Sequence, residues 1–111
     1  LELPAGLRDV DGETEIETAR RELEEEVGCV AETVEHLVTL VTAVGFTDEA
    51  ISIFLARDLT WTRRHADGAE EKSMTVETVP LAEVGPMIRN GEITDAKTVA
   101  GLLLVQQKLI S

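Results

Sequence analysis

A glutamate-rich segment near the start of the chain, residues 14–27, most constrains how this sequence can fold. Four apolar residues recur in it at intervals of three and four, namely Ile16, Ala19, Leu23 and Val27. That spacing places apolar side chains on one face of an α-helix. Gly28 follows directly, and glycine is the residue that most often ends a helix. We therefore expect an amphipathic helix over 14–27 that buries its apolar stripe.

The same helix gathers acidic side chains beside that stripe. Glu22, Glu25 and Glu26 fall on a neighbouring arc about 100° wide, whereas Glu24 points the other way. Carboxylates at spacings of three and four residues repel one another. A hard divalent cation such as Mg²⁺, which favours oxygen ligands, would remove the repulsion. The alternative is a solvated acidic face, which is the usual explanation for a run of glutamates.

The residues around these glutamates follow a recognisable order, which we call the glutamate box (residues 6–29). It consists of a glycine, a loop, Glu, seven residues and Arg-Glu-apolar-x-Glu-Glu-x-Gly-apolar, filled by Gly6, Glu13, Arg21, Glu22, Leu23, Glu25, Glu26, Gly28 and Cys29. This order resembles the signature of the Nudix hydrolases. The loop between Gly6 and Glu13 is one residue longer than in the family pattern, which leaves the helix register after Glu13 unchanged.

The resemblance implies a metal site on the box helix. Its metal ligands would be Glu22, Glu25 and Glu26 together with the backbone carbonyl of Ala5, and Glu25 would also take part in catalysis. The cofactor would be Mg²⁺, with Mn²⁺ as the alternative.

The resemblance also assigns supporting roles next to the metal ligands. Glu13 would pair with Arg21 and hold the glutamates in place; a carboxylate at a helix entrance also suits the positive end of the helix dipole. A glycine at position 6 allows the close backbone approach that a site built from main-chain carbonyls needs, and we expect Gly6 to be among the substrate-binding residues.

A second resemblance lies in residues 44–49, Val-Gly-Phe-Thr-Asp-Glu. They are similar to a loop of the ADP-ribose pyrophosphatase branch of the Nudix enzymes, which implies substrate contacts by Phe46, Asp48 and Glu49. Anchoring of Phe46 to the hydrophobic core is the alternative. Val44 stands where that branch has a proline, and this departure leaves the exact substrate open.

An acidic pair, Glu70 and Glu71, lies in the polar segment 62–73. In the ADP-ribose branch a glutamate of the matching loop is the general base that activates the attacking water, so either residue is a candidate. Spacing does not decide between them, and a solvent-exposed charged loop is the alternative.

The remaining pattern predicts an α/β fold, and the resemblance implies the Nudix-type α/β/α sandwich with a mixed sheet. Strands are expected over 1–5, 34–43, 50–57 (extended by Leu59 and Trp61) and 74–79. A helix from Leu81 should be broken or kinked at Gly85-Pro86 and end at Asn90-Gly91. A last helix over 96–110 should be capped by Asp95. Its buried side should consist of Val99, Leu102, Leu103, Gln106 and Ile110. We expect residues 1–111 to form a single Nudix domain, the C-terminal portion of a longer protein whose N-terminal strands precede this sequence.

Composition narrows the partners. The net charge of −12, from 22 acidic and 10 basic residues, disfavours nucleic-acid binding, which needs clustered Lys and Arg. No run of 18 apolar residues predicts a membrane span. The single cysteine, Cys29, suits a reducing cytoplasm and the interior of the protein. We expect a cytoplasmic enzyme, and the resemblance implies a homodimer.

Three functions are compatible with the sequence. The first is Mg²⁺-dependent cleavage of the pyrophosphate bond of ADP-ribose or a related nucleoside-diphosphate sugar, giving a nucleoside monophosphate and a sugar phosphate. The second is a Nudix hydrolase for a dinucleoside polyphosphate or a nucleoside triphosphate. The third is a non-catalytic, nucleotide-sensing Nudix module, although the complete set of box glutamates argues against a degenerate site.

Overall fold

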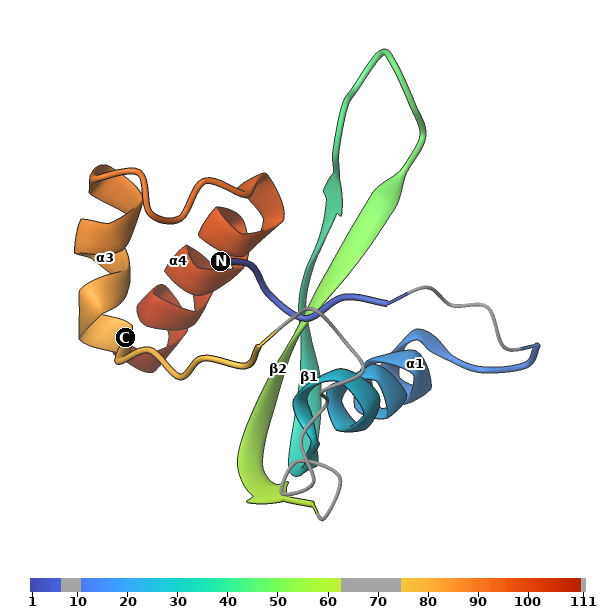
Figure 1. Ribbon diagram of the computed structural model, residues 1–111. Coiled ribbons are helices and arrows are strands. Elements are labelled where there is room, and N and C mark those ends of the chain that lie inside the picture. Colours follow the sequence, from blue (N-terminus) through green and yellow to red (C-terminus); the bar gives the residue numbers. More distant parts are fainter. Residues whose placement is uncertain (7–10, 63–74, 111) are drawn as a thin grey trace. The chain divides into compact units, whose positions relative to one another are not determined.

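The computed structural model describes residues 1–6, 11–62 and 75–110. Residue 110 is described by its backbone alone. In chain order the elements are α1 (Glu15–Glu22), η1 (Leu23–Val27), β1 (Cys29–Val41), β2 (Ala50–Trp61), α3 (Leu81–Arg89) and α4 (Ala96–Ile110), drawn in Figure 1. The chain forms two compact units. We call them the box unit (Pro4–His36 and Phe54–Glu77) and the C-terminal unit (Leu1–Leu3, Leu37–Ile53 and Thr78–Ser111). Each unit is described by itself.

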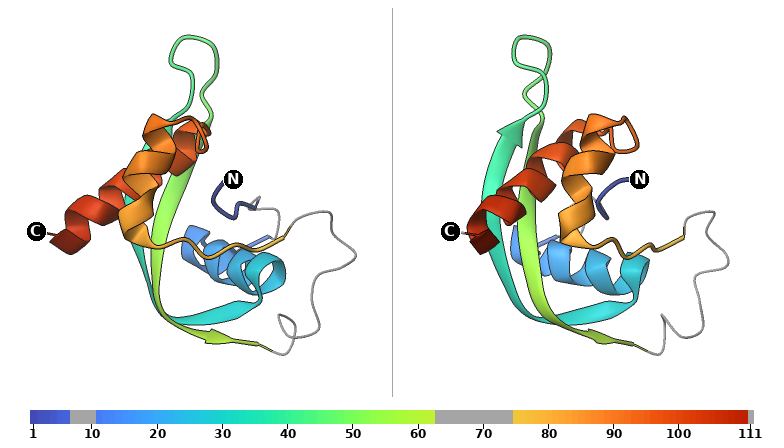
Figure 2. Two further views of the ribbon diagram at one scale, coloured as in Figure 1. Left: turned by 60° about the vertical axis from the view of Figure 1, so that its left-hand side comes forward. Right: turned by 90° about the vertical axis from the view of Figure 1, so that its left-hand side faces the viewer.

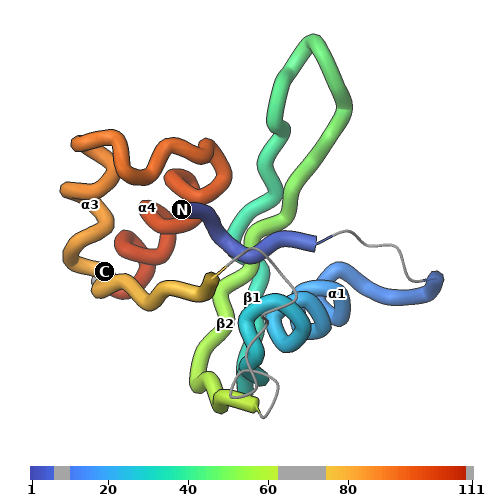
Figure 3. The backbone as a smooth tube through the Cα atoms, in the orientation of Figure 1, coloured from blue at the N-terminus to red at the C-terminus, as the bar shows by residue number. Residues whose placement is uncertain are grey.

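The strands β1 and β2 pair into a two-stranded sheet and run in opposite directions (Figure 1). The tube in Figure 3 follows the chain from β1 through residues 42–49 into β2. At the start of β1, Cys29 and Ala31 are buried and Val30 is exposed, the alternation of a strand with one covered face. The two expected central strands are therefore confirmed, and β1 begins earlier than predicted, directly after Gly28.

In the C-terminal unit α3 packs against α4, and both views of Figure 2 show the two helices side by side. The Gln106 side chain donates to the Leu81 carbonyl over 2.9 Å. The start of the chain also contacts α4, because a Cβ added to Gly101 would lie 2.9 Å from Leu3 Cδ1 and 3.3 Å from Ile53 Cγ2. A glycine at position 101 thus lets Leu3 and Ile53 approach the helix backbone.

The N-cap of α4 and the C-terminal end of α3 agree with the sequence-based prediction. Asp95 accepts from the backbone N–H of Thr98 over 3.1 Å, as an N-cap does. Asn90 ends α3, and Gly91 follows with a φ of 86°. The expected break at Pro86 does not occur, since α3 runs through it, whereas the alternative of a kink stays a prediction. Proline disfavours a helical residue before it by clashing with that residue's Cβ, and Gly85 has none.

Other expectations fail as well. The expected strand over 1–5 is absent. The backbone N–H of Leu3 donates to the Thr98 hydroxyl over 3.0 Å, and a side-chain acceptor cannot continue the backbone hydrogen bonds of a sheet. Of the expected strand 74–79, the described residues 75–79 lie outside any strand. On α4, Thr98 and Gly101 are buried but Leu103 is 45% exposed, so the covered face is centred on the contact with Leu3 rather than on Leu103.

The predicted α/β class is confirmed, and the sheet of the described residues has two strands rather than the larger mixed sheet expected. In the described ranges, no helix combines the length and apolar character needed to cross a membrane.

Candidate functional site

The box helix begins with a reciprocal cap. The backbone N–H of Glu17 donates to the Thr14 hydroxyl over 3.2 Å, and the Thr14 N–H donates to Glu17 Oε1 over 2.8 Å. These contacts satisfy N–H groups that have no partner inside the helix, and the bond from the Thr14 backbone lowers the pKa of Glu17. Sequence reasoning missed this capping box, although Thr-x-x-Glu before an apolar pattern predicts one.

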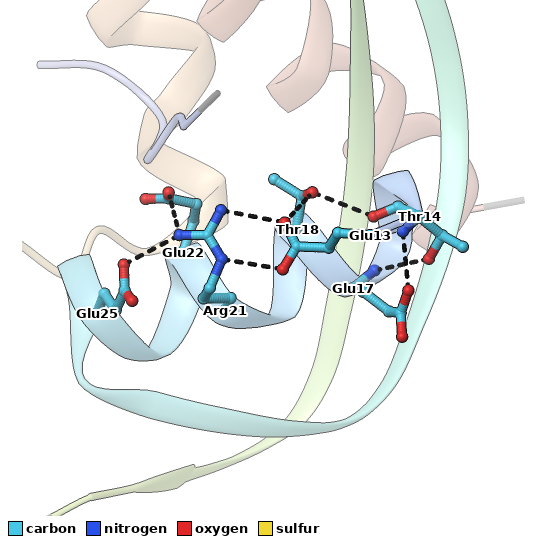
Figure 4. A network of polar contacts seen from close by, with 7 residues as sticks. All are labelled: Glu13, Thr14, Glu17, Thr18, Arg21, Glu22 and Glu25. Carbon is cyan, nitrogen blue, oxygen red and sulfur yellow. Dashed lines mark hydrogen bonds and ion pairs between the residues drawn. The ribbon is translucent and has the colours of Figure 1, made fainter. Parts of the chain in front are cut away.

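With Thr14 as the cap, Glu13 lies one residue before the helix and its carboxylate serves another purpose. Its Oε2 accepts from Arg21 Nε over 3.0 Å, and its Oε1 accepts from Arg21 Nη2 over 3.1 Å. The Thr18 hydroxyl adds a bond of 2.7 Å to the same Oε1 (Figure 4). The predicted pairing of Glu13 with Arg21 is therefore present, in the two-pronged form that fixes a guanidinium best. The contribution of Thr18 gave no sequence signal beyond a threonine on the helix.

The third nitrogen of Arg21 joins two further glutamates. Nη1 donates to Glu22 Oε1 over 3.0 Å and to Glu25 Oε2 over 3.2 Å (Figure 4). One guanidinium thus connects three carboxylates, and the hydrogen bond to Glu13 raises the pKa of Arg21 above its usual range. Because a guanidinium is always charged in proteins, this cation offsets part of the repulsion among the glutamates.

The helix widens where the glutamates are densest. Leu23–Val27 form a π-helical turn, and the Gly28 N–H donates to the carbonyls of both Leu23 and Glu24 over 3.1 Å. Gly28 has a φ of 85°, which ends the helix as predicted. A uniform 100° per residue does not hold through a π turn, so the predicted arcs are only approximate there. Even so, Glu24 is exposed while Glu25 is half-buried, as expected.

The apolar stripe is less covered than expected. Ile16 is 40% exposed, and Ala19, Leu23 and Val27 are half-buried. Within the described residues, this face of the helix therefore keeps a substantial part of its apolar surface exposed.

The end of the box helix is fixed from both strands. Thr62, which follows β2, donates to the Gly28 carbonyl from its backbone N–H over 2.8 Å and from its hydroxyl over 2.9 Å. Arg20 Nη1 donates to the carbonyl of Ala31 on β1 over 2.7 Å. The two bonds from Thr62 hold Gly28, directly after the π turn, to the residue after β2, and the bond from Arg20 holds α1 to β1 within the box unit.

The glycine loop lies directly against the glutamates. A Cβ added to Gly6 would overlap with the carboxyl group of Glu22. The peptide that joins Ala5 to Gly6 is therefore next to this glutamate. The Ala5 carbonyl of this peptide is the expected backbone ligand of the metal. Any larger residue at position 6 would require the Glu22 side chain to move.

The donor set fits a hard cation, because carboxylate and carbonyl oxygens are the ligands that Mg²⁺ prefers. Glu22 lies against Gly6, next to the Ala5 carbonyl, and the Oε2 atom of Glu26 is buried. Among residues 1–6, 11–62 and 75–110, however, no group of three or more His, Cys, Asp or Glu side chains is arranged to hold a metal ion. Glu22 and Glu25 each direct an oxygen to Arg21 instead.

The other predicted site residues come from other segments of the chain. Glu70 and Glu71 lie outside the described residues. Phe46, Asp48 and Glu49 lie between the strands, in the C-terminal unit. Phe46 is 94% exposed, so the alternative of a core anchor is wrong, and the Glu49 carboxylate accepts from the Thr42 hydroxyl over 2.8 Å within the loop.

Cys29, the last residue of the box, is fully buried. Burial raises the pKa of its thiol, which disfavours the nucleophilic thiolate. The prediction that Cys29 is a small core residue is confirmed.

Comparison with known proteins gives a consistent result. A family model described as NUDIX domain matches residues 1–102. An ADP-ribose pyrophosphatase from Mycobacterium tuberculosis is 46% identical over 104 residues, covering 94% of this chain and 50% of that protein. An ADP-ribose pyrophosphatase from Bacillus subtilis is 33% identical over 108 residues, covering 97% and 58%. The crystal structure of an ADP compounds hydrolase superposes with a TM-score of 0.75 at 31% identity, covering 90% of this chain and 54% of the other. The chain thus spans about half the length of the curated relatives it matches.

Proposed function

Because the chain belongs to the NUDIX domain family, we propose that it acts in a divalent-metal-dependent hydrolase of ADP-ribose or a related nucleoside-diphosphate sugar. The reaction would break the pyrophosphate bond with water and release a nucleoside monophosphate and a sugar phosphate. One observation carries the proposal: Arg21 joins Glu13, Glu22 and Glu25 in a single network on the box helix. The names of the two relatives, both ADP-ribose pyrophosphatases, support the substrate class.

We propose that Glu22, Glu25, Glu26 and the backbone carbonyl of Ala5 hold Mg²⁺, with Mn²⁺ as an alternative. A bound cation of this kind offsets the negative charge of pyrophosphate oxygens and makes a bound water more acidic. With a net charge of −12, the chain itself repels an anionic substrate, which is a further reason for a cation at the site.

The protein's own groups would orient the reactants. Arg21 and Glu13 hold the box carboxylates in fixed positions, so that little rearrangement is needed when a ligand binds. Gly6 lets the loop backbone lie against the carboxyl group of Glu22, which a Cβ at this position would displace. Glu70 or Glu71 is the proposed general base that takes the proton from the attacking water, with Glu25 contributing from the helix.

Phe46, Asp48 and Glu49 are proposed to contact the substrate. Nearly complete exposure leaves the Phe46 ring available for stacking on a base. Glu49, in contrast, fixes the loop through Thr42 and Thr47, which supports a role in shaping the loop as well.

A panel of substrates tests the proposal. The full-length protein should be incubated with Mg²⁺ and ADP-ribose, a nucleoside-diphosphate sugar, a dinucleoside polyphosphate and a nucleoside triphosphate, and the phosphate products followed. We expect the first two to be cleaved fastest. No turnover of any of the four would contradict hydrolysis and favour a nucleotide-sensing module, which direct binding of the same ligands would then reveal.

A second candidate is a Nudix hydrolase of another specificity, and Val44 favours it. This residue replaces the proline of the ADP-ribose branch and is 81% exposed, so no packing requirement of the described residues explains the change. Faster cleavage of the dinucleoside polyphosphate or of the triphosphate would support this candidate over the first.

We also propose that the full-length protein is a cytoplasmic homodimer. Ile16 on the box helix is exposed, which supports burial of this face against a part of the full-length protein or its partner subunit. Size-exclusion chromatography with light scattering should give twice the monomer mass; a monomer would contradict the proposal.

A further inference from the structure

Thr18 lies in the middle of α1 and is 7% exposed. Its hydroxyl is 2.7 Å from Glu13 Oε1 and 3.1 Å from the carbonyl of Thr14. A threonine inside a helix commonly bonds to the carbonyl four residues earlier, which here is Thr14. The shorter distance and the charged acceptor instead favour donation to Glu13.

This bond acts on a carboxylate that the helix does not fix. Glu13 precedes the cap Thr14, so its side chain is held by its partners rather than by helical backbone. Oε1 is the oxygen that receives both Thr18 and Arg21 Nη2, whereas Oε2 receives Arg21 Nε. Thr18 therefore fixes the rotation of the carboxylate plane that the guanidinium must match.

The orientation is passed on through a rigid group. A guanidinium is planar, so the two nitrogens bonded to Glu13 determine the direction of the third, Nη1. Nη1 lies 3.0 Å from Glu22 Oε1 and 3.2 Å from Glu25 Oε2. A rotation of the Glu13 carboxylate would move Nη1 and, with it, both glutamates.

We propose that Thr18 is a positioning residue for the cation site, acting through Glu13 and Arg21 on Glu22 and Glu25. The inference rests on the proposed function, because it assumes that these glutamates bind a divalent cation. The hydroxyl, rather than the volume of the side chain, is the group that carries the effect.

Two substitutions separate the hydroxyl from the volume. Thr18→Val keeps the shape and removes the donor, and Thr18→Ser keeps the donor and removes a methyl group. Mn²⁺ binding to the full-length protein, followed by electron paramagnetic resonance, gives a readout independent of turnover. We expect Thr18→Val to weaken Mn²⁺ binding about tenfold, the lower end of the range for groups that orient metal ligands, and Thr18→Ser to stay within about twofold of wild type. The KM for the nucleotide, measured at saturating metal, should change little in either variant.

The outcomes are distinguishable. Wild-type protein that binds no Mn²⁺ and cleaves no substrate would overturn the proposed function and this inference together. Wild-type protein that binds and cleaves while Thr18→Val has unchanged Mn²⁺ affinity would overturn the inference alone. A Thr18→Ser variant as weak as Thr18→Val would also overturn it, because packing of the methyl group would then be the cause. Chemical unfolding of each variant checks that both fold. If Thr18→Val does not fold, the Mn²⁺ affinity of Thr18→Ser is the test, and a loss of affinity in that variant overturns the inference.

Discussion

The start of α1 and the start of α4 are built from the same kinds of group and use them differently. At α4, the Asp95 carboxylate accepts from the Thr98 N–H over 3.1 Å, from the Thr98 hydroxyl over 2.7 Å and from Lys97 over 3.0 Å. At α1, the Glu13 carboxylate likewise accepts from a threonine hydroxyl and a cation.

The difference lies in the backbone. Asp95 is itself the cap and its carboxylate accepts from the Thr98 N–H of its own helix, so its charge is used locally. At α1, Thr14 provides the cap, and the Glu13 carboxylate is bound by a cation that also reaches two more glutamates. The same chemistry therefore stabilises a helix end in one place and organises excess negative charge in the other.

The largest test of this difference is removal of one charge from the π turn. Glu26→Gln should lower the hydrolysis rate by at least about 100-fold, because a ligand of the proposed cation is lost while the fold remains. The matched control is Glu24→Gln on the same turn, where the side chain is exposed and should leave the rate near that of wild type. Equal rates for Glu26→Gln and wild type would remove this residue from the site.

A change of cation compares the two regions directly. Arg21→Lys keeps the charge but cannot form the two-pronged bond to Glu13 and also reach Glu22 and Glu25, so we expect an activity loss of about 10- to 100-fold. Lys97→Arg at α4 should change activity little, since that cation bonds only to Asp95 and Glu2 among the described contacts. Comparable losses in the two variants would contradict the contrast.

Removal of the α1 cap should act on stability alone. Thr14→Ala deletes the hydroxyl that accepts from Glu17 N–H and should lower the free energy of unfolding by about 1 kcal/mol. Denaturant unfolding measures this loss, and activity at a temperature where the variant is folded should be unchanged. An activity loss much larger than the loss of folded protein would mean that the cap also serves the glutamate network.

Acid gives the smallest test. Hydrogen bonds from Thr98 first, and then from Lys97, lower the pKa of Asp95 below its ordinary value of 3.8. Stability from this cap is therefore complete above pH 3.8 and is lost as the pH falls through the lowered, folded-state value. Asp95→Asn should flatten the dependence of stability on pH in that acidic range. An unchanged acid profile would show that the cap charge contributes nothing.

The same comparison explains what the sequence could reveal. The box helix and its end at Gly28 were predictable, because the apolar spacing and the following glycine indicate them, and the pair Glu13–Arg21 was implied by the resemblance to the Nudix signature. The π turn was not, since a helical wheel assumes a constant angle per residue. Nor was Thr18, because a threonine inside a helix carries no mark of its partner.

Tertiary contacts account for the wrong predictions. Leu3 has strand-like neighbours in the sequence, but its N–H bonds to Thr98, and Leu103 matches the helical spacing although Leu3 contacts α4 at Gly101 instead. Pro86 lies inside α3, and the absence of a Cβ at Gly85 removes one of the clashes by which proline disfavours a helical residue before it. Periodicity identifies the elements, whereas the contacts among them depend on residues that are distant along the chain.

The Gly28 carbonyl has a consequence for the order of folding. Its two partners belong to Thr62, which is 34 residues away along the chain and is reached only through the hairpin of β1 and β2. A helix that began at Thr14 could form its turns from local contacts, but the Gly28 carbonyl directly after it gains its partners only after the hairpin has closed. The attachment of the glutamate-bearing turn to Thr62 is thus completed late, and a mutation that slows hairpin closure should delay the acquisition of cation affinity relative to the appearance of helix.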